Sequence, residues 1–209
     1  MPFYQTRGLV SPKRHTVFKR SLNTIYYEEL ISREGFSSMY SNVYHLRMPT
    51  KILELGDIYP FIIKKINTKH KARHIKTQNI PDKGDIVYDR IPLLFNDDVI
   101  IHKAHVTQSM DSFYRNAHFD EVLYIQSGSG QLFTNFGHLE VKSGDYIIIP
   151  RGVIWQLEIN NNIRCLVIES RAPVETPSRY RNKFGQLLEH APFCERDVRL
   201  AFSFIFFGF

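Results

Sequence analysis

The chain has 209 residues, of which 43% are apolar and 13% aromatic, with 27 Lys and Arg against 21 Asp and Glu. That length suits one domain of ordinary size with its own core, and the apolar fraction excludes a disordered chain. Two cysteines favour a reducing compartment, no apolar run approaches the roughly 20 residues that cross a bilayer, and the first 15 residues lack the apolar region of a signal peptide. We therefore expect a cytoplasmic protein with no membrane partner.

The formal charge of +6 is most concentrated at residues 64–76, which hold six Lys or Arg, two His and no acid. Nucleic-acid binders usually add exposed aromatic residues or a reading motif to such charge, and this run has neither. We interpret it as a solvated strand and loop and expect no nucleic-acid partner. His70 and His74 would share a face only in a helix, and no third metal ligand accompanies them.

The first 50 residues are irregular and rich in Phe and Tyr, so we expect an extended, aromatic-rich amino-terminal arm. The one helix predicted in this arm covers residues 25–33, with Gly35 placed to end it. From residue 51 onward, apolar and β-branched residues predict extended structure, interrupted at Gly56 and Pro60.

Residues 98–170 give the clearest pattern, in which short alternating runs are separated by turn residues every 8–12 positions or less. The predicted strands are 98–107, 121–126, 131–135, 138–141, 146–149, 153–159 and 163–169. Such spacing is typical of an all-β sandwich or barrel. We therefore expect a mainly β domain over residues 51–170, with its core strands at 98–170.

The last part of the chain changes composition twice. Residues 171–200 are polar and basic and read as a connector, with one helical turn expected near residues 186–190. The tail at residues 201–209 holds five of the 16 Phe and no charge. A buried closing strand and a non-native, aggregation-prone end are both compatible with that composition, and we expect the second.

The spacing of the glycines indicates which kind of all-β fold to expect. Glu121 stands seven residues before Gly128, and Gly144 is followed by Pro150 and Gly152. This frame resembles the cupin double motif, in which two hairpins of a jelly-roll barrel present metal ligands to the interior. The resemblance implies a cupin-like jelly roll whose glycines adopt backbone conformations that other residues avoid.

The metal ligands of that motif are largely missing. The positions where a cupin carries its three histidines hold Tyr114, Asn116 and Trp155, so that only Glu121 remains, with His118 displaced nearby. A transition metal needs three or four N or O donors that converge at about 2.0–2.2 Å. We therefore assign no metal ligand.

Other chemically capable residues form no site. His102 and His105 lie three apart on a strand and should point to opposite faces, and the adjacent acids Asp120 and Glu121 should diverge in the same way. Cys165 alternates with apolar residues and is expected in the core, whereas Cys194 lies in a charged loop without a partner base. We assign no catalytic, cofactor-binding or metal-binding residue.

A run of short segments in matching order extends over roughly residues 1–200. These segments are Met1-Pro2-Phe3-Tyr4, Pro12-Lys13-Arg14-His15-Thr16, Tyr27-Glu28-Glu29-Leu30, Glu34-Gly35-Phe36-Ser37, Tyr44-His45, Arg115-Asn116-Ala117, Asp120-Glu121-Val122-Leu123, Gly128-Ser129-Gly130, Phe136-Gly137, Gly144-Asp145-Tyr146, Ile149-Pro150-Arg151-Gly152, Tyr180-Arg181-Asn182, Phe184-Gly185-Gln186-Leu187 and Pro192-Phe193-Cys194-Glu195-Arg196-Asp197. In these segments the chain resembles the amino-terminal half of the homogentisate 1,2-dioxygenase family.

The resemblance implies a fold of two cupin-like domains, assembled as a hexamer built from trimers. It also implies cleavage of homogentisate by O₂ at a non-haem Fe(II) ion, giving maleylacetoacetate in tyrosine and phenylalanine breakdown. In the family, two His and one Glu of the second half hold the iron. We therefore expect this chain to be the truncated, non-catalytic half, with residues 171–200 leading toward an absent second domain and no iron bound to this half.

A second interpretation stays open. The chain could be a standalone cupin-like scaffold or oligomerisation domain, or the remnant of an interrupted gene. On either interpretation we expect these 209 residues alone to be inactive.

Overall fold

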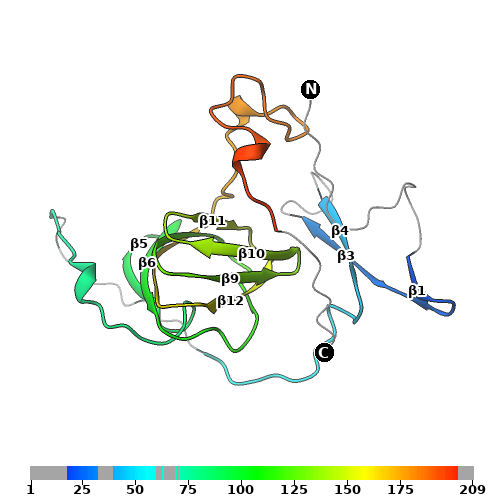
Figure 1. Cartoon of the computed structure of the whole chain (residues 1–209), viewed down its shortest axis with the longest axis horizontal. Coiled ribbons are helices and arrows are strands. Elements are labelled where there is room, and N and C mark those ends of the chain that lie inside the picture. Colours follow the sequence, from blue (N-terminus) through cyan, green and yellow to red (C-terminus); the bar gives the residue numbers. More distant parts are fainter. Residues whose placement is uncertain (1–17, 33–39, 60–62, 64–68, 70, 202–209) are drawn as a thin grey trace. The chain divides into compact units, whose positions relative to one another are not determined.

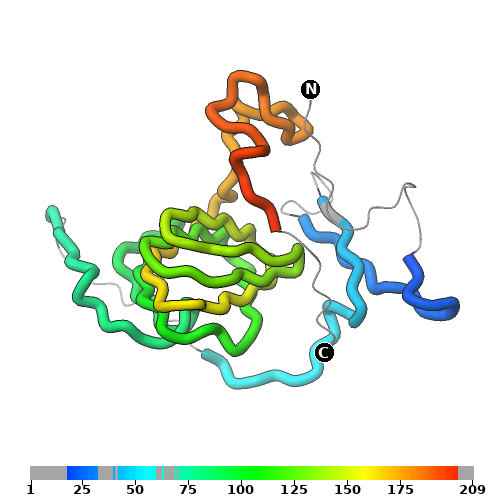
Figure 2. The backbone as a smooth tube through the Cα atoms, viewed as in Figure 1, coloured from blue at the N-terminus to red at the C-terminus, as the bar shows by residue number. Residues whose placement is uncertain are grey.

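The computed structural model describes residues 18–32, 40–59, 63, 69 and 71–201 (Figure 1). The chain divides into two compact units, one formed by residues 9–68 and the other by residues 1–8 and 69–209. The smooth trace in Figure 2 follows the larger unit through two stacked layers of strands.

The smaller unit consists of short antiparallel pairs. Strand β1 (Lys19–Ser21) pairs with β2 (Thr24–Ile25), and β3 (Tyr27–Ser32) pairs with β4 (Tyr40–His45). The helix expected at residues 25–33 is therefore wrong. An isolated helix of that length is marginal in water, whereas here the segment gains a partner strand, and the ring of His45 bonds Glu29 across the pair at 2.8 Å.

Residues 51–59 form no strand, although their composition predicted extended structure from this point. Their large apolar side chains are exposed: Ile52 is 72% accessible and Ile58 is 92% accessible. β-branched side chains favour a strand only where a neighbouring strand and a packed face receive them. The part of the expectation that concerns residues 60–62 lies outside the described residues.

The larger unit is built from two antiparallel sheets that face each other (Figure 1). The first has the order β10 (Gly137–Lys142), β9 (Ser129–Thr134), β12 (Ile154–Ile159) and β7 (Tyr114–Arg115). The second has the order β11 (Tyr146–Ile149), β8 (Asp120–Ser127), β13 (Ile163–Ser170), β6 (Val99–Val106) and β5 (Ile91–Phe95). The chain changes sheet between β8 and β9, between β10 and β11, and between β12 and β13.

This arrangement confirms the mainly β, cupin-like class. All seven strands predicted between residues 98 and 170 are present with ends within two residues of the prediction. The sheets are stacked as a sandwich and do not close into a continuous barrel through strand pairing among the described residues. The prediction succeeded because alternation with period two marks strands that have one buried face.

The core fills the space between the sheets and draws on both. Its fully buried members include Leu123 and Val167 from the five-stranded sheet and Leu132 and Trp155 from the four-stranded sheet. Ile86, from the irregular segment before β5, is also fully buried in it.

Gly128 shows why glycine is required at a change of sheet. Its φ of +94° lies in the left-handed region, and a Cβ atom there would lie 2.3 Å from the carbonyl oxygen of Asn162. Gly144 also has a positive φ, +92°, but faces open space. Both glycines therefore serve the backbone conformation, as the sequence predicted, and at Gly128 the close approach of a neighbouring strand adds a second reason.

Part of the outer face of the five-stranded sheet is also apolar. One cross-strand row on it consists of Ile148, Val122, Ile168, Ile101 and Leu94, and a second row begins with Tyr146, Tyr124 and Leu166. Tyr146 is 70% accessible and Ile148 53%. These eight residues are called the outer apolar face below.

Three-residue 3₁₀ turns occur at η1 (Thr77–Asn79), η2 (Ser178–Tyr180) and η3 (Glu195–Asp197). The helical turn expected near residues 186–190 is wrong. Leu187 instead bridges to Arg181, and the N–H of Asn182 donates to the carbonyl of Gln186, because Gly185 turns the chain back on itself with a φ of +81°.

The tail at residues 202–209 lies outside the described residues, so its expected role stays a prediction. None of the described helices is long and apolar enough to span a membrane.

Candidate functional site

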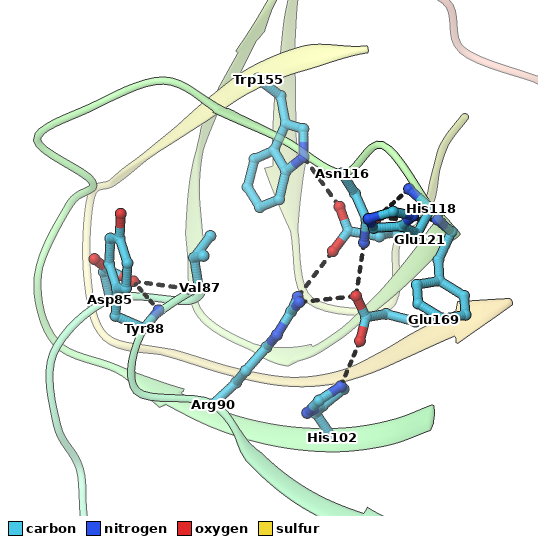
Figure 3. Close-up of polar contacts among 11 residues, drawn as sticks. Asp85, Val87, Tyr88, Arg90, His102, Asn116, His118, Glu121, Trp155 and Glu169 are labelled. Atoms are coloured by element: carbon cyan, nitrogen blue, oxygen red, sulfur yellow. Dashed lines mark hydrogen bonds and ion pairs between the residues drawn. The ribbon is translucent and has the colours of Figure 1, made fainter. Parts of the chain in front are cut away.

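A cluster of buried polar side chains lies between the two sheets, at one end of the core (Figure 3). Its members, called the polar cluster below, are Arg90, His102, Asn116, Glu121, Trp155 and Glu169. Each is at most 8% accessible to solvent. Buried charges are costly unless they are paired, so the pairing decides what this cluster can do.

Two acids form the base of the cluster. Glu121 on β8 and Glu169 on β13 are direct cross-strand partners, and both alternate with inward-facing apolar residues such as Leu123 and Val167. The two carboxylates are therefore held side by side inside the protein. Like charges directly opposite each other on neighbouring strands repel, and low dielectric strengthens that repulsion.

Arg90 supplies the opposing charge. Its Nη1 donates to Oε1 of Glu121 at 2.8 Å, and its Nη2 donates to Oε1 of Glu169 at 3.0 Å. Arg90 directly precedes β5 at the edge of the sheet, and its side chain extends inward between the two acids (Figure 3). The planar guanidinium can bridge two acceptors in a way that a lysine ammonium cannot.

Three further donors complete the coordination of the acids. The ring Nε2 of His102 lies 2.7 Å from Oε2 of Glu169, and Nδ2 of Asn116 donates to Oε1 of Glu169 at 2.6 Å. Nε1 of Trp155 donates to Oε2 of Glu121 at 3.2 Å. Each carboxylate oxygen therefore has at least one partner.

Asn116 and Tyr114 attach the cluster to the four-stranded sheet. The side-chain oxygen of Asn116 accepts the backbone N–H groups of His118 and Phe119, which fixes a turn just before β8. Tyr114 on β7 packs edge-on against Trp155, with ring centroids 5.5 Å apart, and lies under the Arg90 guanidinium at 6.0 Å.

The two acids differ in electrostatics. Burial raises the pKa of Glu121 above its ordinary value, and the charge and hydrogen bond of Arg90 offset that only in part. Burial acts the same way on Glu169, but the hydrogen bond from His102 and the charge of Arg90 outweigh it and lower the pKa of Glu169. Burial also raises the pKa of Tyr114 to about 12, so this phenol is a neutral hydrogen-bonding group.

The cluster does not fit a metal ion as it stands. Among the residues that the structure describes, no three His, Cys, Asp or Glu side chains are arranged to hold a metal. The acid oxygens that face each other are already bonded to a guanidinium, and a divalent ion would bring a second positive charge against it. The donor set is therefore filled by the chain itself.

The structure brings together residues that the sequence considered separately. Three of the cupin ligand positions lie together in the polar cluster, namely Asn116, Glu121 and Trp155, and Tyr114 packs beside them. The side chain of His118 is exposed, and this residue contacts the cluster only through its backbone N–H, which donates to Asn116. The sequence motif gave one carboxylate at this centre, whereas the structure has two, because Glu169 lies beside Glu121, and His102 adds an imidazole that bonds Glu169.

The other candidates lie elsewhere. His105 points away from His102, as the strand alternation predicted, and its Nδ1 lies 3.1 Å from Oδ1 of Asp82. Asp120 diverges from Glu121 and accepts from the backbone and side chain of Arg151, and from the backbone N–H of Val174.

Cys165 is fully buried in the core, as expected, and burial raises the pKa of its thiol to about 12. Cys194 is a half-buried free thiol in the carboxy-terminal segment. His74 is exposed, and His70 lies outside the described residues.

Sequence reasoning missed Arg90 and the role of Glu169. Glu169 lies near the end of a strand whose inward positions are Ile163, Cys165 and Val167. An acid at the next inward position therefore indicated a buried partner. Arg90 gave no comparable signal, because it precedes its strand and only the fold brings it across the sheet.

Comparison with known proteins agrees with this fold. The family model described as "Homogentisate 1,2-dioxygenase N-terminal" matches residues 92–179. A Saccharolobus solfataricus protein named "putative dioxygenase" is 38% identical over 202 residues, which cover 96% of this chain and 52% of that protein. The homogentisate 1,2-dioxygenase of Bradyrhizobium diazoefficiens is 36% identical over 61 residues, 29% of this chain and 14% of that protein.

Solved structures give weaker likenesses. A cupin protein from Bacteroides fragilis is 19% identical with a TM-score of 0.38, covering 46% of this chain and 87% of its own. A Neisseria meningitidis protein is 13% identical with a TM-score of 0.40, covering 47% of this chain and 99% of its own.

The resemblance to the amino-terminal part of the homogentisate 1,2-dioxygenase family is thus confirmed over residues 92–179, which match that family's N-terminal model. The chain spans about half the length of the Saccharolobus relative that it matches.

Proposed function

We propose that this chain is the non-catalytic, amino-terminal half of a homogentisate 1,2-dioxygenase, whose jelly roll supports a separate iron-bearing half. The family match over residues 92–179 carries the proposal. The polar cluster supports the non-catalytic part, because the cupin ligand positions here are engaged with an arginine. Cytoplasmic location, Fe(II) use by the whole enzyme and a role in tyrosine and phenylalanine catabolism belong to the same proposal.

The residues of this chain contribute to such an enzyme by stabilising its structure and not by catalysis. The cluster joins the two sheets through Asn116 and Trp155, and Arg90 pairs the two acids of the five-stranded sheet, so the domain can present a fixed surface. The chemistry of ring cleavage would be supplied by Fe(II) in the other half, and none of the residues that the structure describes takes part in it.

The direct test is reconstitution. The purified chain is incubated anaerobically with Fe(II), desalted and analysed for iron, and then mixed with homogentisate in air while O₂ uptake is followed. We expect substoichiometric iron and no O₂ uptake above the protein-free control. Iron near one equivalent that disappears in Glu121→Ala would contradict the proposal.

The link to a catalytic half has its own test. The nucleotides that follow the Leu200 codon are read in all three frames, together with the neighbouring genes. We expect them to encode the family's carboxy-terminal half, because the Saccharolobus relative is about twice as long as its match. A genome without that half would leave the standalone scaffold as the function.

The scaffold alternative is favoured by the outer apolar face. A face with two apolar cross-strand rows, on which Tyr146, Ile148 and Leu94 are each more than half accessible, is typical of a contact surface. The occupant we propose is a second copy of this chain, since two copies of the same apolar sheet surface can pack face to face at about 10 Å.

Sedimentation tests this assembly. The chain should sediment as a dimer or larger species at tens of micromolar, and Ile148→Glu should convert it to a monomer. Lys142→Glu, on an exposed strand of the other sheet, serves as the matched control and should leave assembly unchanged. A monomeric parent chain, or an assembly that survives Ile148→Glu, would contradict the scaffold.

A further inference from the structure

The centre of the polar cluster has the organisation of a cation site. The Arg90 guanidinium lies between the carboxylates of Glu121 and Glu169, which belong to two strands (Figure 3). The imidazole of His102 and the side-chain amide of Asn116 form hydrogen bonds with Glu169. Buried carboxylates are compensated either by a paired side chain or by a metal ion, and carboxylate and imidazole donors suit divalent metals. Here the positive charge belongs to a side chain.

The register explains why a cation is required. Glu121 and Glu169 are paired residues on β8 and β13, so the backbone fixes them as neighbours whatever occupies the space between them. Both are at most 4% accessible, so water cannot screen the repulsion. The two carboxylates are therefore stable in this position only if a positively charged group lies between them.

We propose that the Arg90 guanidinium is the resident cation of this jelly roll, occupying the place of a divalent metal ion and excluding one. It reaches both acids with separate nitrogens, as a bridging metal would with separate coordination positions. It is covalently part of the chain and keeps its charge at every pH at which the protein folds.

The proposal predicts what remains when the guanidinium is removed. Glu121, Glu169, His102 and Asn116 would offer two carboxylates, an imidazole and an amide around the vacated space. Carboxylate and imidazole donors suit Mn²⁺, Fe²⁺ and Zn²⁺. Truncation of Arg90 should therefore uncover a divalent-cation site by small rotations of the two glutamates.

This inference does not depend on the proposed function. It concerns only contacts within the jelly roll, and it would hold equally for a dioxygenase half and for a standalone scaffold.

The experiment compares the parent chain with Arg90→Ala. The thermal midpoint of Arg90→Ala should fall by roughly 10 °C, because two buried acids lose their partner. Millimolar methylguanidinium or Mn²⁺ should each restore roughly 5 °C or more of that loss, while neither changes the parent midpoint. Electron paramagnetic resonance should show about one Mn²⁺ bound per Arg90→Ala chain and none bound to the parent chain.

Two variants control the comparison. Arg151→Ala removes another arginine from a buried acid, Asp120, which keeps two backbone donors, and should show no response to either cation. Arg90→Ala combined with Glu121→Gln and Glu169→Gln should lose the Mn²⁺ response, because the two anionic donors are replaced by neutral amides.

Three results would overturn the proposal: Mn²⁺ bound stoichiometrically by the parent chain, an unchanged midpoint in Arg90→Ala, or a destabilised Arg90→Ala that no cation restores. If Arg90→Ala is insoluble, refolding yield replaces the midpoint. Soluble protein recovered only with methylguanidinium or Mn²⁺ supports the proposal, and no recovery with either overturns it.

Discussion

The inner face of the five-stranded sheet has two halves with opposite chemistry. Toward one end, the paired residues Ile125, Cys165 and Ala104 meet across three strands, all buried and apolar. Toward the other end, Glu121 opposes Glu169, with His102 beside them. The same strands, in the same register, therefore build a dry apolar core and a charged centre a few residues apart.

The comparison shows what each half needs from the rest of the chain. The apolar half is satisfied by any well-packed apolar side chain from the opposite sheet. The charged half is satisfied only by a specific donor, and Arg90, Asn116 and Trp155 reach it from three separate elements. Substitutions in the two halves should therefore differ in size, in pH dependence and in the substitutes that restore stability.

Among single substitutions other than Arg90→Ala, the largest loss is expected in the apolar half. Leu123→Ala removes a fully buried side chain and should lower the free energy of unfolding by about 3 kcal/mol, because a cavity remains. Urea denaturation monitored by tryptophan fluorescence measures this loss, and the loss should be the same at pH 5 and pH 8. Ile148→Ala, on the exposed outer face, is the matched control and should cost under about 1 kcal/mol.

Glu169→Gln should come next, at about 2 kcal/mol near neutral pH, because three charged or polar donors lose an anionic acceptor. Glu121→Gln should cost less, since its acid has two donors and a raised pKa. Equal losses, or a larger loss for Glu121→Gln, would contradict the assignment of Glu169 as the more strongly held carboxylate.

The pH dependence separates the same two acids. The pKa of Glu169 is lowered by folding, so its contribution is present above the ordinary pKa of about 4.3 and is lost as pH falls through the folded value. The pKa of Glu121 is raised, so stability declines as pH rises through the folded value. Denaturation between pH 3 and 8 should therefore show a weaker acid-side loss in Glu169→Gln and a weaker decline on the other side in Glu121→Gln.

Trp155→Phe tests the boundary between the halves. The substitution keeps an aromatic ring against Tyr114 but removes the indole N–H that donates to Glu121. A cost of about 1.5 kcal/mol is expected from the lost hydrogen bond and the smaller ring. Adding Glu121→Gln should reduce that cost, and a double-mutant cycle by urea denaturation measures the coupling. Strict additivity would show that Trp155 serves packing alone.

The smallest effect belongs outside both halves. Arg164 lies on the outer side of β13 and pairs with Asp82 at 3.6 Å, with both side chains about half accessible. Arg164→Ala should change the free energy of unfolding by at most about 0.5 kcal/mol, because exposed ion pairs are screened. A loss comparable to that of Glu169→Gln would contradict the view that burial determines how much an ion pair of this sheet contributes to the free energy of unfolding.

The two halves also differ in how far sequence could predict them. The apolar half follows from period-two alternation, which located seven strands and placed Cys165 in the core. The charged half depends on partners that are distant in sequence, since Arg90 and Glu169 are 79 residues apart. No local sequence pattern predicts the contact between Arg90 and Glu169. The cupin motif indicated the position of the polar cluster only through Asn116, Glu121 and Trp155.

The smaller unit marks a different limit. Residues 25–33 carry both helix-forming and strand-forming side chains, and the choice was made by pairing with residues 40–45. Local propensity was too weak to decide it.

The most direct test of the central claim is an anomalous diffraction experiment on crystals of the parent chain grown with millimolar MnCl₂. The account predicts a planar guanidinium between the carboxylates of Glu121 and Glu169 and no anomalous peak within bonding distance of either acid. A manganese peak between those two carboxylates, with the Arg90 side chain displaced, would contradict it.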